Sequence, residues 1–155
     1  MRVAIGADHA GFELKETVAG WVAGAGHEVV DVGAFAMDPQ DDFPDFAEAV
    51  GRAVQDGRAE RGIMLCGSAV GACVAANKLR GIRAATCHDT YSAHQGVEHD
   101  AMNVLCLGGR IVGTAVAEEI VAAYLTAIYV PEERFQRRLD KVMAIEESTG
   151  GIAGE

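Results

Sequence analysis

Residues 63–78 read Ile-Met-Leu-Cys-Gly-Ser-Ala-Val-Gly-Ala-Cys-Val-Ala-Ala-Asn-Lys, and this stretch decides the fold. Four apolar residues run into two glycines spaced four apart, and a segment of small residues follows. This pattern is typical of a buried strand, a tight turn and a helix. Backbone N–H groups at such a helix start lack partners, and the helix dipole adds positive charge there. The sequence therefore predicts an anion site over residues 67–71.

Cys66 lies at this turn and is a candidate base or nucleophile. A thiol at a helix N-terminus meets a field that favours the thiolate, so its pKa can fall well below the ordinary value of about 8.5. The alternative is an inert cysteine in a structural turn, since free cysteine is among the most buried residue types. The stretch has neither the Gly-Lys-Ser/Thr of a Walker loop nor the Gly-x-Gly-x-x-Gly of a dinucleotide site.

Length and composition predict one domain over residues 1–155, since 155 residues with 50% hydrophobic content can bury one substantial core. No apolar run approaches the roughly 18 residues of a membrane span, and the N-terminus leads directly into strand-like sequence. We expect a soluble, cytoplasmic protein that binds no membrane. The four cysteines show no C-x-x-C spacing, so we expect reduced thiols rather than a disulfide framework or a zinc ribbon.

The charge of the chain argues against a nucleic-acid partner. Its formal net charge is −10, and phosphate-backbone binding needs a clustered basic face. Four of the 13 lysines and arginines nevertheless fall in one short C-terminal stretch, as Arg134, Arg137, Arg138 and Lys141. This cluster could supply the positive charge that an anionic small molecule needs.

Apolar runs alternate with amphipathic segments along the whole chain. We expect strands over 2–7, 28–33, 63–66, 82–87 and 103–110. Helices are expected over 12–25, 44–55, the small-residue segment that ends at Lys78, a segment through about His94, 114–127 and 132–147, before a loose tail over 148–155. This order predicts an α/β fold with a single doubly wound, mostly parallel, five-stranded Rossmann-like sheet. Residues 131–147 would form a C-terminal helical arm across a surface.

The polar residues that end the predicted strands are candidates for a ligand site, because ligands bind at the carboxyl edge of open parallel sheets. Asp8, His9, residues 66–71 and His88 should meet there. The structural alternative makes Asp8 a helix cap and His9 a surface turn residue. The acidic loop over 34–43 is interpreted as solvated surface. Neither this loop nor Cys87-His88-Asp89 is assigned a metal, since three or four converging ligands are needed.

Several separate motifs resemble the type B ribose-5-phosphate isomerases and the related galactose-6-phosphate isomerases. They occur in the family's order and span nearly the whole chain: Gly6-Ala7-Asp8-His9-Ala10-Gly11-Phe12-Glu13-Leu14-Lys15, Asp42-Phe43-Pro44-Asp45, Cys66-Gly67-Ser68, Ala75-Ala76-Asn77-Lys78, Gly81-Ile82-Arg83-Ala84, Glu98-His99, Asn103-Val104-Leu105 and the C-terminal arginines. The resemblance implies isomerisation of an aldose phosphate to its ketose through an enediolate, without metal or cofactor.

The resemblance also implies a role for each matching residue. Cys66 would take the C2 proton, and His99 would assist opening of the sugar ring. The backbone N–H groups of Gly67, Ser68, Ala69, Val70 and Gly71 would hold the enediolate oxygens. Asp8 would orient sugar hydroxyls, and the phosphate would be bound by His9, Arg110, Arg134 and Arg138. The family shares each site between two subunits of a dimer, so the arm is expected to pack on a partner subunit; pairing of dimers into tetramers stays open.

Four positions depart from the family pattern. Ala69 replaces a glycine, Phe43 a tyrosine, Phe135 a histidine and Asp100 an asparagine. Asp100 is counted among the substrate-binding residues, where an ionised carboxylate can no longer donate a hydrogen bond. The base and the phosphate arginines are intact, so the departures bear on which sugar is used. Ribose 5-phosphate is the leading substrate; the alternatives are a six-carbon sugar phosphate or a non-catalytic sugar-phosphate-binding protein.

Overall fold

A five-stranded parallel sheet forms the centre of the computed structural model, which describes residues 1–149. The strands are β1 (Arg2–Ala7), β2 (Glu28–Asp31), β3 (Arg61–Cys66), β4 (Ala84–Thr86) and β5 (Val104–Gly108), in the order β2-β1-β3-β5-β4. Every adjacent pair is parallel. The predicted α/β fold with a five-stranded parallel sheet is confirmed.

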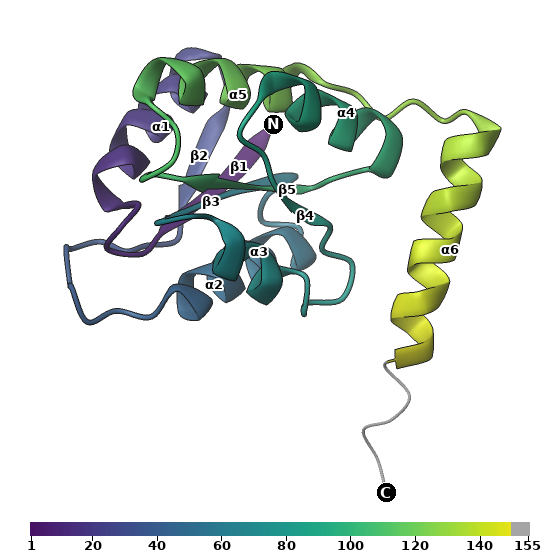
Figure 1. The fold of residues 1–155 in the computed structure, drawn as a ribbon, viewed down its shortest axis with the longest axis horizontal. Helices are drawn as coiled ribbons and strands as arrows, with labels where there is room; N and C mark the ends of the chain where they lie inside the picture. The colour runs from purple at the N-terminus through teal and green to yellow at the C-terminus, as the bar shows by residue number, and fades with distance from the viewer. Residues whose placement is uncertain (150–155) are drawn as a thin grey trace, which may run out of the picture.

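Helices cover both faces of the sheet (Figure 1). On one face lie α1 (Phe12–Gly24), α4 (Thr90–Asp100) and α5 (Thr114–Thr126), and on the other α2 (Phe43–Gln55) and α3 (Val70–Ala76). Alternate strand residues feed the two cores, so that Ile63 and Leu65 pack on one side and Met64 and Cys66 on the other. Burial on both faces explains why the central strands β1, β3 and β5 are near-continuous apolar runs.

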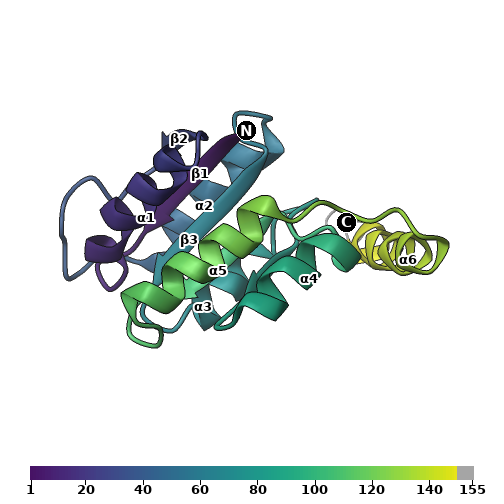
Figure 2. The same ribbon diagram turned by 90° about the horizontal axis from the view of Figure 1, so that it is seen from above.

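The arm is the helix α6 (Glu133–Thr149), which lies outside the layered body beside the end of α4 (Figures 1 and 2). It extends through Thr149, so the tail predicted from Ser148 begins too early, and its remainder lies outside the described residues. Within residues 1–149, no helix combines the length and the apolar character needed to cross a membrane.

Helix α4 is longer than predicted. The expected end near His94 is wrong, because the helix continues to Asp100 and ends where Ala101 adopts a left-handed conformation with φ 51°. Polar residues and Gly96 obscured the pattern, but Ala93 and Val97, one helical turn apart, are both buried. The consequence is that His99 and Asp100 lie on the last turn of a helix.

The order of the strands creates a crevice at the carboxyl edge of the sheet. From β1 the chain moves outward to β2 and then returns to the other side of β1 to form β3, so the loops after β1 and β3 diverge. The Asp8 N–H donates to the Leu65 carbonyl at 3.2 Å, which places Asp8 next to Cys66. A Cβ at Gly11 would approach the Leu65 carbonyl to 2.5 Å, so this junction needs glycine.

Candidate active site

A cavity of about 410 Å³ lies in this crevice. The loops that follow β1, β3 and β5 form its walls together with the start of α2. Its lining residues are Asp8, His9, Ala10, Phe43, Cys66, Gly67, Ser68, Gly71, Arg110 and Ile111. The structure thus brings together the predicted base Cys66, Asp8 and two of the four predicted phosphate ligands, His9 and Arg110. His88 is not among the lining residues.

Cys66 ends β3 and is only 4% exposed. The Ala69 N–H donates to its Sγ at 3.2 Å, a contact that favours the thiolate. Burial outweighs this contact and raises the pKa of the Cys66 thiol, and the charge of Asp8 adds to the effect. The prediction of a lowered pKa is therefore wrong: the sequence indicates the helix start but not the depth at which the thiol is buried beneath the turn.

The pH dependence of alkylation tests whether the pKa of Cys66 is raised. Cys73 is half-buried and accepts a hydrogen bond from the Cys106 thiol, which lowers the pKa of Cys73 to about 6. We expect iodoacetamide to modify Cys73 at a rate that levels off near neutral pH, whereas the rate at Cys66 keeps rising beyond about pH 8.5. Peptide mass spectrometry measures the two rates in one sample. A rate at Cys66 that levels off below neutral pH would contradict the raised pKa.

The turn after Cys66 is tight. Ala69 is buried in a left-handed conformation with φ 69°, the geometry that the expected glycine would adopt more easily. The Ala69 and Val70 N–H groups donate within the turn, to Cys66 Sγ and to Ser68 Oγ. Of the predicted amide donors, Gly67, Ser68 and Gly71 belong to the residues that line the cavity.

Asp8 lines the cavity and holds the turn before α1, but it does not cap that helix, whose N-cap residue is Gly11. The buried Asp8 carboxylate accepts hydrogen bonds from the Ala10 and Gly11 N–H groups at 2.9 and 3.0 Å, which fixes the start of α1. Opposite, the Phe43 ring packs so closely on Gly71 that a Cβ there would lie 2.7 Å from it. The phenylalanine that replaces the family's tyrosine therefore forms an apolar wall.

His9 has a partner that sequence reasoning missed. Asp41 belongs to the loop interpreted as solvated surface, yet its side chain is only 10% exposed and accepts hydrogen bonds from the His9 backbone and ring. The solvated-surface interpretation is wrong for this residue. The missed signal was the position of the loop after β2, directly beside β1 in the sheet.

His99 and Arg134 form a second group of predicted site residues, which does not line the cavity around Cys66. Gln95 lies 2.8 Å from His99 Nδ1, and the His99 ring stacks on Phe135 of α6 with ring centres 3.9 Å apart. The Arg134 guanidinium lies 4.4 Å from the centre of the Phe135 ring. This group therefore sits where α4 meets α6.

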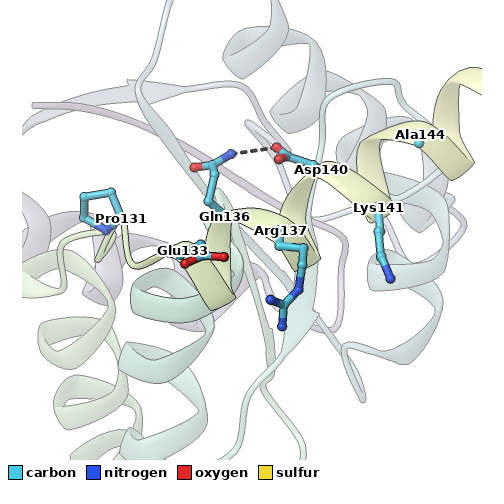
Figure 3. A pocket seen from close by; sticks show the side chains of 7 residues that line it. All are labelled: Pro131, Glu133, Gln136, Arg137, Asp140, Lys141 and Ala144. Carbon is cyan, nitrogen blue, oxygen red and sulfur yellow. Dashed lines mark hydrogen bonds between the residues drawn. The ribbon is translucent and has the colours of Figure 1, made fainter.

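The basic residues of the arm are divided between faces of α6. Figure 3 shows Arg137 and Lys141 beside the acidic residues Glu133 and Asp140 in a hollow that Arg134 and Arg138 do not line. Asp100 is exposed and lines a different groove, between α6 and the loop before β4. Among the described residues, no group of three or more histidine, cysteine or acidic side chains is arranged to hold a metal ion.

Comparison with known proteins matches residues 3–142 to the model of the Ribose/Galactose Isomerase family. The chain belongs to this family. It is 42% identical to D-erythrulose-4-phosphate isomerase of Pectobacterium atrosepticum, over 82% of this chain and 84% of that protein. It is 40% identical to ribose-5-phosphate isomerase B of Escherichia coli, over 94% of this chain and 97% of that protein.

A solved structure supports the same assignment. Ribose-5-phosphate isomerase B of Clostridium thermocellum superposes with a TM-score of 0.92 at 40% identity, covering 96% of this chain and 99% of that one. The family resemblance expected from the motifs is confirmed, and with it the assignment of the chain as an aldose-ketose isomerase.

Proposed function

We propose that this enzyme interconverts ribose 5-phosphate and ribulose 5-phosphate, with Cys66 as the base. The observation that carries the proposal is the cavity that holds the Cys66 thiol beside Asp8, His9 and Arg110. A carbon-acid base, groups that orient hydroxyls and cationic groups for a phosphate are what this isomerisation needs. The similarity to ribose-5-phosphate isomerase B over almost the whole chain supports the choice of pentose.

The reaction moves one proton from C2 to C1 and one from the 2-hydroxyl to O1, and it leaves the overall oxidation state unchanged. The Cys66 thiolate takes the proton from C2 of the open-chain aldose, the electron pair forms an enediolate, and a proton is delivered to C1 to give the ketose. In this proposal, the amides of Gly67, Ser68 and Gly71, residues that line the cavity, hold the enediolate oxygens. A raised thiol pKa lowers the fraction of thiolate but makes each thiolate a stronger base toward a weak carbon acid.

His99, Asp100, Arg134 and Arg138 act, in this proposal, at the cavity of a second copy of the chain. Two features support a dimer with shared sites. The His99 group does not line its own chain's Cys66 cavity, and apolar side chains near that cavity are exposed: Phe43, Val70, Val74 and Ile111. Exposed apolar surface of this kind marks interaction sites. The four free cysteines support a cytoplasmic location, where thiols stay reduced.

A four-carbon substrate is the second candidate, because one of the most similar relatives is a D-erythrulose-4-phosphate isomerase. The test is a panel of ribose 5-phosphate, erythrose 4-phosphate, allose 6-phosphate and galactose 6-phosphate, assayed for ketose formation with EDTA present. We expect the highest kcat/KM with ribose 5-phosphate. A preference for erythrose 4-phosphate would favour the four-carbon substrate. If no sugar gives a ketose, the chain is a non-catalytic sugar-phosphate-binding protein.

A further inference from the structure

Asp41 reaches from the loop between β2 and α2 to His9 at the cavity. Its Oδ1 accepts a hydrogen bond from the His9 backbone N–H at 3.0 Å and lies 2.7 Å from His9 Nδ1. The backbone N–H of Asp41 donates to the Asp38 carbonyl, so the segment that carries the carboxylate is itself held in a turn. Two contacts to one residue fix both the backbone and the ring of His9.

The chemistry of a carboxylate determines which ring nitrogen carries hydrogen. An ionised carboxylate only accepts hydrogen bonds, so Nδ1 of His9 must be the donor. The other ring nitrogen, Nε2, is then the one left to meet a ligand in the cavity that His9 lines. Asp41 thus decides which part of the imidazole a substrate encounters.

His9 is the partner of a carboxylate that is largely buried. The Asp41 side chain is 10% exposed, and its buried Oδ2 has no hydrogen-bond partner among residues 1–149. A buried carboxylate is costly unless it is paired with a positive charge. Asp38 and Asp42 carry charge in the same loop, and Asp8 and Arg110 line the cavity with His9. Among the described residues, the ion-pair contact of Asp41 is with His9. An imidazolium donates from both nitrogens and so presents Nε2–H to an anion.

We propose that Asp41 is a positioning residue that orients the His9 ring, with Nε2 toward the cavity, to bind the substrate phosphate. This inference rests on the proposed function, in which His9 binds that phosphate. Asp41 itself need not touch substrate. Its removal should therefore weaken phosphate binding and leave the proton transfer at Cys66 nearly unchanged.

The variant Asp41→Asn tests the inference, because asparagine keeps the shape and an acceptor oxygen but removes the charge. We expect KM for ribose 5-phosphate and Ki for inorganic phosphate to rise together about 10-fold, with kcat within about 2-fold of the parent. The matched control is Asp38→Asn, which removes the same charge from the same loop and keeps an acceptor for the Gln40 N–H. This control should leave both constants unchanged.

A double-mutant cycle separates this inference from the proposed function. His9→Ala should weaken phosphate binding, and in that background Asp41→Asn should have no further effect. If His9→Ala leaves Ki for phosphate unchanged, the phosphate role of His9 in the proposed function is wrong. If His9→Ala raises Ki but Asp41→Asn does not, or if Asp41→Asn lowers kcat alone, the proposed function stands and the inference about Asp41 is overturned.

Discussion

Replacement of Cys66 by alanine is expected to lower kcat for ribose 5-phosphate by about 10⁴-fold, at the upper end of what one acid–base group contributes. Asp8 also lines the cavity next to Cys66, but it is a poor substitute for the thiolate because two backbone N–H groups already donate to its carboxylate. Phosphate affinity should persist, because His9 and Arg110 are untouched. Steady-state kinetics and competition by inorganic phosphate measure the two effects separately.

Cys73→Ala is the matched control for Cys66→Ala. Cys73 lies on α3, carries a thiol and hydrogen-bonds to the Ala84 carbonyl, outside the set of residues that line the cavity. Its replacement should change kcat by no more than about 2-fold. If Cys66→Ala keeps about a tenth or more of the parent kcat, Cys66 is not the base.

His99→Ala is expected to separate substrates that form a ring from those that do not. Ribose 5-phosphate closes a five-membered ring through its free 4-hydroxyl, whereas the phosphate of erythrose 4-phosphate occupies that oxygen. If His99 transfers the proton that opens the ring, kcat/KM should fall about 10²-fold or more for ribose 5-phosphate and only slightly for erythrose 4-phosphate. Parallel assays of both sugars with the same enzyme preparation measure the ratio.

The control for His99→Ala is His94→Ala on the same helix. His94 lies 3.2 Å from Glu98 Oε2, faces a different neighbour and belongs to neither group of site residues. Its loss should leave the preference between the two sugars unchanged. An equal loss with both sugars in His99→Ala would mean that His99 acts after ring opening.

The fold was predictable because it depends on local patterns. The three central strands, β1, β3 and β5, are buried on both faces and appear as apolar runs. Pro44 and the glycines at 67 and 71 mark helix starts. The predicted helix boundaries were wrong where exposed polar residues hide the helical period. In α4, the buried residues Ala93 and Val97 lie among polar ones. The length of that helix mattered, because it carries His99.

The site was predictable only in its first half. Residues that end β1 and β3 meet because parallel strands share a carboxyl edge, and this placed Asp8, His9 and Cys66 together. Contacts between segments distant in sequence left no local signal. The Asp41–His9 pair depends on how a loop folds back, and the stacking of Phe135 on His99 depends on where α6 lies.

The pKa of Cys66 is a second property that could not be predicted from the sequence. Spacing in the sequence locates a thiol at a helix start, but the balance between its amide contact and its desolvation depends on its burial. In the structure, desolvation raises the pKa of Cys66 by more than the amide contact lowers it. A sequence pattern therefore identifies this candidate base without giving its protonation state.

The most direct test of a site shared between two copies is complementation between Cys66→Ala and His99→Ala, co-expressed with different affinity tags. In a mixed dimer, one site combines the intact Cys66 of one chain with the intact His99 of the other, and the second site carries both changes. Random pairing of the two variants predicts about a quarter of the parent activity on ribose 5-phosphate. A mixture that stays as inactive as the separate variants, although mixed dimers are recovered through both tags, would contradict the account.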